Sequence, residues 1–258
     1  MEAEILLAHA LEVDRLHLYL APDKPLTTDE RTRYRTVIQK RHEGTPLQHI
    51  IGEVSFYGLR FKVSREALIP RAETEELLDH VLKQAPRDRP IRCLDLGTGT
   101  GVIAVCLARY LPSASITAVD ASPAALALAK ANAKLNSVEA RIDFLESHWF
   151  TRVEGCFDLI VSNPPYVSAE DLVSLPREVR EHEPSVALNG GESGLESIAS
   201  ILASMPVHLA PDGLVLMEIG GTQGPDVVKL MQVAGLEAAS VEQDMAGKDR
   251  FAMARRPS

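Results

Sequence analysis

The fold is decided by the stretch Arg92–Ala108, which reads RCLDLGTGTGVIAVCLA. Its first five residues are short and mostly apolar, which predicts a buried strand. The alternate glycines of Gly97–Gly101 then let the backbone approach a ligand closely. Val102–Ala108 is typical of the start of a buried helix, whose N-terminus offers unpaired N–H groups and a partial positive charge. The stretch therefore predicts a strand, a ligand-binding turn and a helix.

The residues that follow indicate what kind of ligand this turn binds. Gly99–Ala104 satisfies the G-x-G-x-x-A form of the dinucleotide fingerprint. A second strand, Ser115–Asp120, ends in an acid about 20 residues beyond the glycines, where a carboxylate can accept from ribose hydroxyls. Ser122 and Pro123 then fit the N-cap and first position of a helix. These patterns predict a nucleoside cofactor on a parallel sheet and leave NAD and S-adenosylmethionine both open.

The second informative stretch is Asn163–Tyr166, the sequence Asn-Pro-Pro-Tyr at the end of the apolar run Phe157–Ser162. The run predicts a buried strand that two prolines close abruptly. Since proline fixes φ near about −65° and lacks an N–H, the tip is stiff and its carbonyls are free to accept. It presents the Asn163 side-chain carbonyl, the Pro164 main-chain carbonyl and the Tyr166 ring. Such a tip suits a primary amide or an exocyclic amine, although a proline-rich turn with an asparagine cap has the same pattern.

The tip favours methyl transfer, because hydride transfer needs no rigid pair of carbonyls at this strand. An amide nitrogen is a poor nucleophile, since its lone pair is delocalised. Two acceptors that hold both N–H groups would align the nitrogen with the methyl carbon of S-adenosylmethionine, and such positioning supplies ~7–11 kcal/mol in favourable cases. No general base is expected before transfer, because the proton becomes acidic only as the nitrogen quaternises.

Leu94–Gly101 followed by Asn163–Tyr166 resembles the class I, S-adenosylmethionine-dependent methyltransferases that act on amide or exocyclic nitrogen. The Asn-Pro-Pro-Tyr motif alone is shared with DNA adenine and RNA guanine methyltransferases. Five further segments are similar to the protein glutamine-N5 methyltransferases that modify class-1 peptide-chain release factors, so the resemblance covers nearly the whole chain. These segments are Pro46–Gly52, Phe56–Gly58, Leu68–Arg71, Glu183–Leu188 and Gly190–Leu195.

This resemblance implies an α/β fold with a Rossmann-like, seven-stranded class I methyltransferase sheet and a small helical N-terminal domain. It implies transfer of a methyl group from S-adenosylmethionine to the N5 amide nitrogen of the glutamine in the Gly-Gly-Gln motif of release factors, in translation termination. The implied cofactor-binding residues are Gly97, Thr98, Gly99, Thr100 and Gly101 at the methionine end, Asp120 at the ribose, Trp149 near the adenine, and Asn163. The implied substrate clamp is Asn163, Pro164, Pro165 and Tyr166, of which Asn163, Pro164 and Tyr166 are the implied catalytic residues.

The sequence departs from the family's pattern in three places. Ala72 stands where the family usually has a proline after Leu68–Arg71, and His148 stands where an acid often precedes the tryptophan. The start Met1–Leu7 resembles the middle of the family's N-terminal region, so we expect the family's leading helix to be absent. Arg71 itself has two interpretations, a functional residue at the mouth of the site or a partner for a neighbouring acid.

Composition narrows the function classes. The 258 residues carry a net charge of −9, which argues against a general nucleic-acid binder with a basic footprint. We find no apolar run of ~18 residues and no basic leader before an apolar segment, so neither a membrane span nor a signal peptide is expected. The three cysteines, Cys93, Cys106 and Cys156, lack metal-ligand spacing and are expected to be small buried hydrophobes in a reducing cytoplasm. We expect a cytoplasmic monomer.

The domain organisation follows from the pattern along the chain. Residues 1–64 are expected to form a helical substrate-docking domain that ends in a β-hairpin at Glu53–Val63, and residues 65–258 the methyltransferase domain. The strongly charged helix that begins at Thr27–Glu30 is either a docking surface or a solvated packing helix. Ala238–Gln243 and Arg250–Ala254 are expected to close the sheet as an antiparallel pair, which a dinucleotide-binding domain lacks.

The long, polar and weakly patterned stretch 167–194 favours a lid over the substrate, since such a loop in a compact domain is usually functional or mobile. Glu181–Glu183 contains two acids and a histidine, but nothing completes a ligand set and no metal is expected. Alternatives to the release-factor substrate are a glutamine of a ribosomal protein or adenine in DNA. Alternatives from other classes are a nicotinamide-dependent oxidoreductase and a binding module without catalysis.

Overall fold

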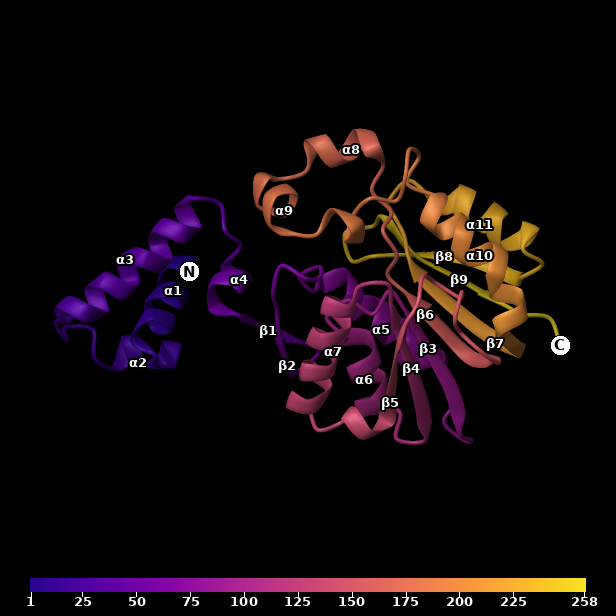
Figure 1. The fold of residues 1–258 in the computed structure, drawn as a ribbon, viewed down its shortest axis with the longest axis horizontal. Helices are drawn as coiled ribbons and strands as arrows, with labels where there is room; N and C mark the ends of the chain where they lie inside the picture. Colours follow the sequence, from indigo (N-terminus) through magenta and orange to yellow (C-terminus); the bar gives the residue numbers. More distant parts are fainter.

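The computed structural model describes residues 1–258, and it places a small helical region beside a larger α/β region (Figure 1). The larger region is built on a seven-stranded sheet. Its strands are β3 (Ile91–Leu96), β4 (Ala114–Asp120), β5 (Ile142–Glu146), β6 (Phe157–Ser162), β7 (Leu209–Glu218), β8 (Glu237–Gln243) and β9 (Asp249–Arg255). They lie in the order β5-β4-β3-β6-β7-β9-β8. The predicted fold class is confirmed.

The direction of the strands separates this sheet from an all-parallel one. β5, β4, β3, β6 and β7 are parallel neighbours, whereas β9 runs antiparallel to β7 and β8 antiparallel to β9. The closing pair is the one that the sequence predicts. Because five parallel strands end at one edge, the residues that follow β3, β4 and β6 are gathered there, where ligands bind in such sheets.

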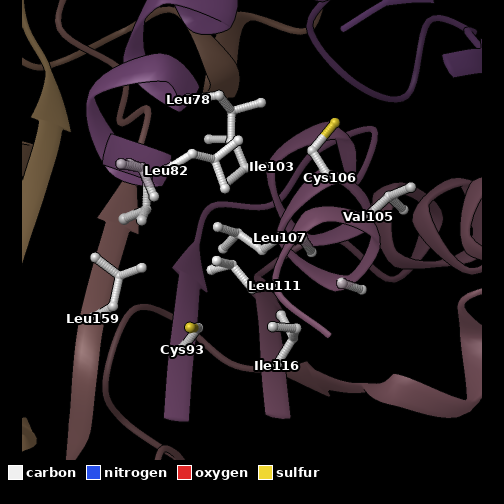
Figure 2. Close-up of a cluster of buried hydrophobic side chains, with 14 of the residues drawn as sticks. Leu78, Leu82, Cys93, Ile103, Val105, Cys106, Leu107, Leu111, Ile116 and Leu159 are labelled. Carbon is white, nitrogen blue, oxygen red and sulfur yellow. The ribbon is translucent and has the colours of Figure 1, made fainter. Parts of the chain in front are cut away.

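Helices cover both faces of the sheet, because its central strands are apolar on both sides. One face carries α5 (Ala72–Gln84), α6 (Val102–Tyr110) and α7 (Pro123–Leu135), and the other carries α10 (Glu196–His208) and α11 (Gly224–Val233). Figure 2 shows the first face, where Leu78, Leu82 and Leu107 gather over Cys93 and Leu159. This packing holds the N-terminal ends of α5 and α6 at the edge of the sheet that carries the glycine turn.

The helical region is formed by α1 (Glu2–Leu11), α2 (Arg15–Leu20), α3 (Thr28–His42) and α4 (Leu47–Ile51). Thr27 and Glu30 form a capping box at the start of α3, where the sequence predicts that a helix begins. A hairpin of β1 (Glu53–Phe56) and β2 (Leu59–Lys62) follows, and it leads into the sheet region. The predicted division after residue 64 falls just beyond this hairpin and stays a prediction.

The stretch 167–194 is more regular than its weak pattern indicates, because it contains α8 (Ala169–Ser174) and α9 (Arg177–His182). Ser168 caps α8 by accepting a hydrogen bond from the Asp171 backbone N–H at 3.1 Å. Figure 1 shows the two helices between the helical region and the sheet. There Arg41 of α3 donates to Glu178 of α9 at 2.8 Å, so the stretch is tied to the N-terminal helices.

The cysteines differ in their environment. Cys93 and Cys106 are buried, as expected, and both lie in the cluster of Figure 2. The same prediction is wrong for Cys156, which is exposed because it lies in the turn just before β6. None of the helices has both the length and the apolar character that a membrane span requires.

Candidate active site

Backbone and side-chain hydrogen bonds fix the glycine turn, Gly97–Gly101, that follows β3. The N–H groups of Gly97 and Thr98 both donate to the Val119 carbonyl, at 2.9 and 2.8 Å. The Thr98 hydroxyl donates to Asp95 Oδ2 at 2.6 Å, and the Ala104 N–H reaches the same oxygen at 3.0 Å. These bonds join the turn to β3, to the neighbouring strand β4 and to the first turn of α6.

Asp95 is fully buried beneath the turn. Burial raises the pKa of its carboxyl to about 7, and the charge of Asp120 adds to the rise, while the bonds from Thr98 and Ala104 oppose it. Its second oxygen, Oδ1, has no hydrogen-bond partner. Asp95 therefore supports the turn at an electrostatic cost and does not reach the cavity above it.

Asp120 stands at the end of β4 with both carboxylate oxygens oriented by the backbone. Oδ2 accepts from the Gly99 N–H at 2.8 Å and Oδ1 from the Ser122 N–H at 2.9 Å. A carboxylate oxygen can accept more than one hydrogen bond, so acceptor capacity remains on the side of the cavity that Asp120 lines. Such a fixed pair of acceptors suits vicinal hydroxyls.

Trp149 is held in a left-handed backbone conformation with φ 47°, which is unusual for a bulky residue. The Ser147 hydroxyl donates to the Trp149 carbonyl at 3.0 Å and accepts from the Arg152 N–H at 2.9 Å, which fixes this turn. The indole closes on the glycine turn: a Cβ at Gly97 would lie 3.4 Å from the ring. The strained backbone at Trp149 therefore places a flat aromatic ring beside the glycine turn.

Asn163 follows β6 and is half-buried. Its Nδ2 donates to the Thr74 hydroxyl at 3.1 Å, and no protein donor reaches its Oδ1. The Pro164 carbonyl accepts no backbone hydrogen bond. Tyr166 packs partly buried in the core under α10, and its hydroxyl donates to Glu218 at 3.0 Å. The tip therefore holds unpaired acceptors on a rigid backbone.

A cavity of about 370 Å³ brings most of the predicted residues together. Those in its wall are Gly97, Thr98, Gly99, Thr100, Asp120, Trp149, Asn163 and Pro165. Gly101, Pro164 and Tyr166 are outside the wall. Gly101 lies instead against α7, where a Cβ would be 2.9 Å from the Ala129 Cβ.

Arg71 lies in the cavity wall and pairs with an acid, so the second of its two interpretations is confirmed, while a functional role stays a prediction. Arg71 lines the cavity and also donates to Glu183 at 2.5 Å. The neighbouring His182 Nδ1 lies 2.8 Å from Arg65, and Glu181 pairs with Arg177 at 2.9 Å. The three side chains of Glu181–Glu183 thus turn to three different arginines and do not converge on a common point.

Two family models match this chain, one in each region. Residues 72–182 match the Methyltransferase small domain, and residues 1–52 match the PrmC N-terminal domain. The chain is 42% identical over 258 residues to the release factor glutamine methyltransferase of Cereibacter sphaeroides, covering 100% of this chain and 91% of that one. It is 41% identical to the protein of that name from Geobacter sulfurreducens, covering 97% and 87%.

The chain belongs to the release factor glutamine methyltransferase family. It is therefore an enzyme, a methyltransferase, and its methyl donor is S-adenosylmethionine. Solved structures agree in fold. A methyltransferase from Pyrococcus furiosus has a TM-score of 0.59 at 16% identity, covering 88% of this chain and 99% of that one. A ribosomal protein L11 methylase from Lactobacillus delbrueckii subsp. bulgaricus has a TM-score of 0.55 at 21% identity, covering 72% and 80%.

The cavity fits the donor by the chemistry of its wall. Its volume falls in the range of ligand pockets, roughly 300–1,000 Å³. Asp120 offers acceptors for ribose hydroxyls, and the Trp149 indole offers a flat surface for a base. Val102 and Ile103, at the N-terminus of α6, also line the cavity, where free N–H groups suit the carboxylate of the methionine portion. The predicted residues that line this cavity, and so would hold the donor, are Gly97, Thr98, Gly99, Thr100, Asp120, Trp149 and Asn163.

Thr74, Glu183 and Glu218 are the site residues that sequence reasoning missed. Thr74 lies in the first turn of α5, where nothing in the local pattern marks it. Glu183 lies in a segment that carries the family resemblance, but no role follows for it from the sequence. The sequence pattern does indicate Glu218, because it is an acid at the end of the apolar strand β7, which lies beside the strand that leads to Asn163. A charged residue at the end of a central parallel strand is buried at a cost, which indicates a role.

Proposed function

We propose that this enzyme methylates the N5 amide nitrogen of the glutamine in the Gly-Gly-Gln motif of class-1 peptide-chain release factors. Its family supports a release-factor glutamine as the acceptor. The single observation that carries the finer proposal is the orientation of Asn163. Its Nδ2 is bonded within the protein, its Oδ1 is unpaired, and Asn163 lines the same cavity as the glycine turn. A carboxamide nitrogen between these two elements faces the methyl donor.

In this proposal the substrate amide is held by two acceptors. Asn163 Oδ1 accepts from one N–H of the amide. The Pro164 carbonyl, which has no backbone partner, accepts from the other, and since Pro164 is outside the cavity wall the amide must reach beyond the wall to meet it. Both acceptors are neutral, so the site suits a carboxamide better than the carboxylate of glutamate, which has no hydrogen to donate. S-adenosylmethionine, when bound, supplies an electrophilic methyl group. The role of the protein is alignment: the N–C bond would form as the S–C bond of the donor breaks, with its electron pair kept by sulfur, and the amide nitrogen would then lose one proton to water.

The protein substrate is recognised by more than the cavity. We assign residues 1–64 to docking, as a helical domain before the methyltransferase domain of residues 65–258. The contact of Arg41 with Glu178 supports this assignment, because it joins the helices to the stretch beside the cavity mouth. The enzyme would act in the cytoplasm, where release factors work, and as a monomer.

The test is mass spectrometry of a purified class-1 release factor after incubation with the enzyme and S-adenosylmethionine. We expect one added methyl group on the peptide that contains Gly-Gly-Gln, located on the glutamine amide by fragmentation. A release factor with that glutamine changed to alanine is the matched control and should gain nothing. Methylation of both proteins, or of a ribosomal protein in preference to the release factor, would overturn the proposed substrate.

A further inference from the structure

A buried chain of hydrogen bonds lies behind the Asn163 carboxamide. Asn163 Nδ2 donates to the Thr74 hydroxyl at 3.1 Å, and that hydroxyl donates to Glu218 Oε2 at 2.7 Å. The other carboxylate oxygen, Oε1, accepts from the Tyr166 hydroxyl at 3.0 Å. Thr74 and Glu218 are 4% and 1% exposed, so water does not compete for these bonds.

The carboxylate sets the direction of every bond in this chain. Two hydroxyls donate to Glu218 and the charge of Arg250 favours its ionised form, which only accepts, so each hydroxyl gives its single hydrogen to the carboxylate. The Thr74 oxygen then has only lone pairs left for Asn163. The Asn163 amide must therefore turn its NH2 group toward Thr74, and its carbonyl Oδ1 points away from the protein interior. If the amide were flipped, two acceptors would face each other in a buried site.

Arg250 supports the charge on Glu218. Its guanidinium lies near the carboxylate and is held by Asp244 at 3.2 Å and by the Ile219 carbonyl at 3.0 Å. Burial raises the pKa of Glu218, and the hydroxyls of Thr74 and Tyr166 together with the charge of Arg250 oppose that rise. Two hydroxyl donors and the charge of Arg250 thus offset part of the cost of burying the acid.

We propose that Thr74 and Glu218 are positioning residues that lock the Asn163 carboxamide with its carbonyl oxygen toward the substrate amide. This inference rests on the proposed function, because it explains how the proposed acceptor is oriented. The same orientation would explain why the site prefers an amide to a carboxylate. With the carbonyl oxygen locked outward, a glutamine can donate to it, whereas a glutamate carboxylate would meet a second acceptor.

The decisive variants are Thr74→Val and Thr74→Ser. Valine keeps the shape of threonine but removes the hydroxyl, so Asn163 can rotate and we expect kcat to fall about 10- to 100-fold. Serine keeps the hydroxyl, and its kcat should return to within about threefold of the parent. Thr117→Val is the matched control, since Thr117 lies within β4, its hydroxyl makes no side-chain hydrogen bond and it does not line the cavity. Its kcat should be unchanged.

A specificity measurement separates orientation from mere damage to the fold. The inhibitor is a release factor in which the Gly-Gly-Gln glutamine is changed to glutamate. We expect the parent enzyme to bind it at least about tenfold more weakly than the glutamine protein, and Thr74→Val to narrow this ratio, because its Asn163 can turn an NH2 group outward. Thr74→Val should lower the melting temperature by a few degrees, because Glu218 loses one donor, while calorimetric binding of S-adenosylmethionine should be close to that of the parent.

Coupling between the two positions gives an independent check. If Thr74 and Glu218 act through the same amide, Thr74→Val combined with Glu218→Gln should be little worse than the more damaging single change. The proposal is overturned by Thr74→Val activity within twofold of the parent, by an unchanged specificity ratio, or by single effects that simply multiply. Should Glu218→Gln fail to fold, the valine and serine pair decides alone.

Asn163→Ala distinguishes failure of this inference from failure of the proposed function. Activity of the Asn163→Ala enzyme would contradict the proposed substrate clamp itself, and with it the proposed function. An inactive Asn163→Ala enzyme beside a fully active Thr74→Val enzyme would leave the clamp in place and remove only the positioning role of Thr74 and Glu218.

Discussion

Arg71 and Glu183, 112 residues apart in the chain, form an ion pair of 2.5 Å at the mouth of the cavity. The Glu183 side chain is buried, while Arg71 keeps about a third of its surface exposed. Glu183 also accepts from the Ile69 N–H at 3.2 Å. The segment before α5 and the stretch that follows α9 are therefore joined across the opening through which a substrate side chain would enter.

Arg71→Ala tests this link. It leaves the Glu183 carboxylate buried with a single backbone donor, a loss that we expect to cost about 1–3 kcal/mol locally. We expect faster hydrogen exchange in residues 177–190 and a KM for release factor that rises more than the Kd for S-adenosylmethionine. Arg177→Ala breaks the exposed pair with Glu181 in the same segment and should cost only about 0.5 kcal/mol. Equal exchange in the two variants would show that the pair does not hold the mouth.

Asn163→Ala should abolish methylation and leave the fold intact. The side chain donates only one protein hydrogen bond, to Thr74, so its removal disturbs little of the core. Because a lost acceptor acts at the moment of transfer, we expect kcat to fall by about 100-fold or more. Single-turnover kinetics and circular dichroism measure the two effects. Full activity in this variant would refute the amide clamp.

Tyr166→Ala should impair the substrate more than the cofactor. Tyr166 is outside the cavity wall and is packed in the core, with its hydroxyl on Glu218 and its carbonyl accepting from Gln223. Loss of the ring lets the Asn163–Tyr166 tip move, so we expect the release-factor KM to rise about tenfold. The calorimetric Kd of S-adenosylmethionine should change less than threefold. Tyr166→Phe, which removes only the hydroxyl, is the matched control and should fall between parent and alanine variant.

The parts of this molecule that sequence reasoning predicted are those whose causes are local. The strand and glycine turn at Arg92–Gly101 are coded by neighbouring residues, and so are the Ser122 cap of α7 and the Tyr57-Gly58 hairpin. The Thr74–Glu218 bond joins residues 144 apart, and only the packed sheet brings them together. The short helices α8 and α9 escaped prediction because each has too few residues for a hydrophobic period to be visible.

Gly101→Ala should destabilise the protein although Gly101 does not line the cavity. Its φ is 82°, and an added Cβ would lie 2.9 Å from the Ala129 Cβ and 3.0 Å from the Ala129 Cα on α7. Left-handed strain and overpacking together should cost about 2–4 kcal/mol. Gly247 has a similar φ of 74°, but a Cβ added there would have nothing within 4 Å. Gly247→Ala therefore carries the backbone strain without the overpacking. Chemical denaturation of both variants measures the difference, and equal losses would exclude the α6–α7 contact as the cause.

The buried Asp95 predicts a pH dependence of stability with a definite sign. Burial raises its folded-state pKa to about 7, from an ordinary value of 3.8. At a pH between these two pKa values, the Asp95 carboxyl has lost its proton in the unfolded chain but keeps it in the folded chain. The free energy of unfolding should therefore fall as pH rises through this window, by an amount on the order of a few kcal/mol, and the cost should be fully present above about pH 7.

Asp95→Asn isolates this contribution, because an amide carries no charge at any pH. Its carbonyl oxygen can still accept from Thr98 and Ala104, while its NH2 group takes the place of the unpartnered Oδ1 at a cost that does not vary with pH. We expect urea unfolding of this variant between about pH 4 and pH 7 to give a flatter profile than the parent. Asp226→Asn, an exposed change on α11, should keep the parental slope. Parallel profiles for the parent and Asp95→Asn would mean that Asp95 is ionised throughout and that the glycine turn tolerates a buried charge.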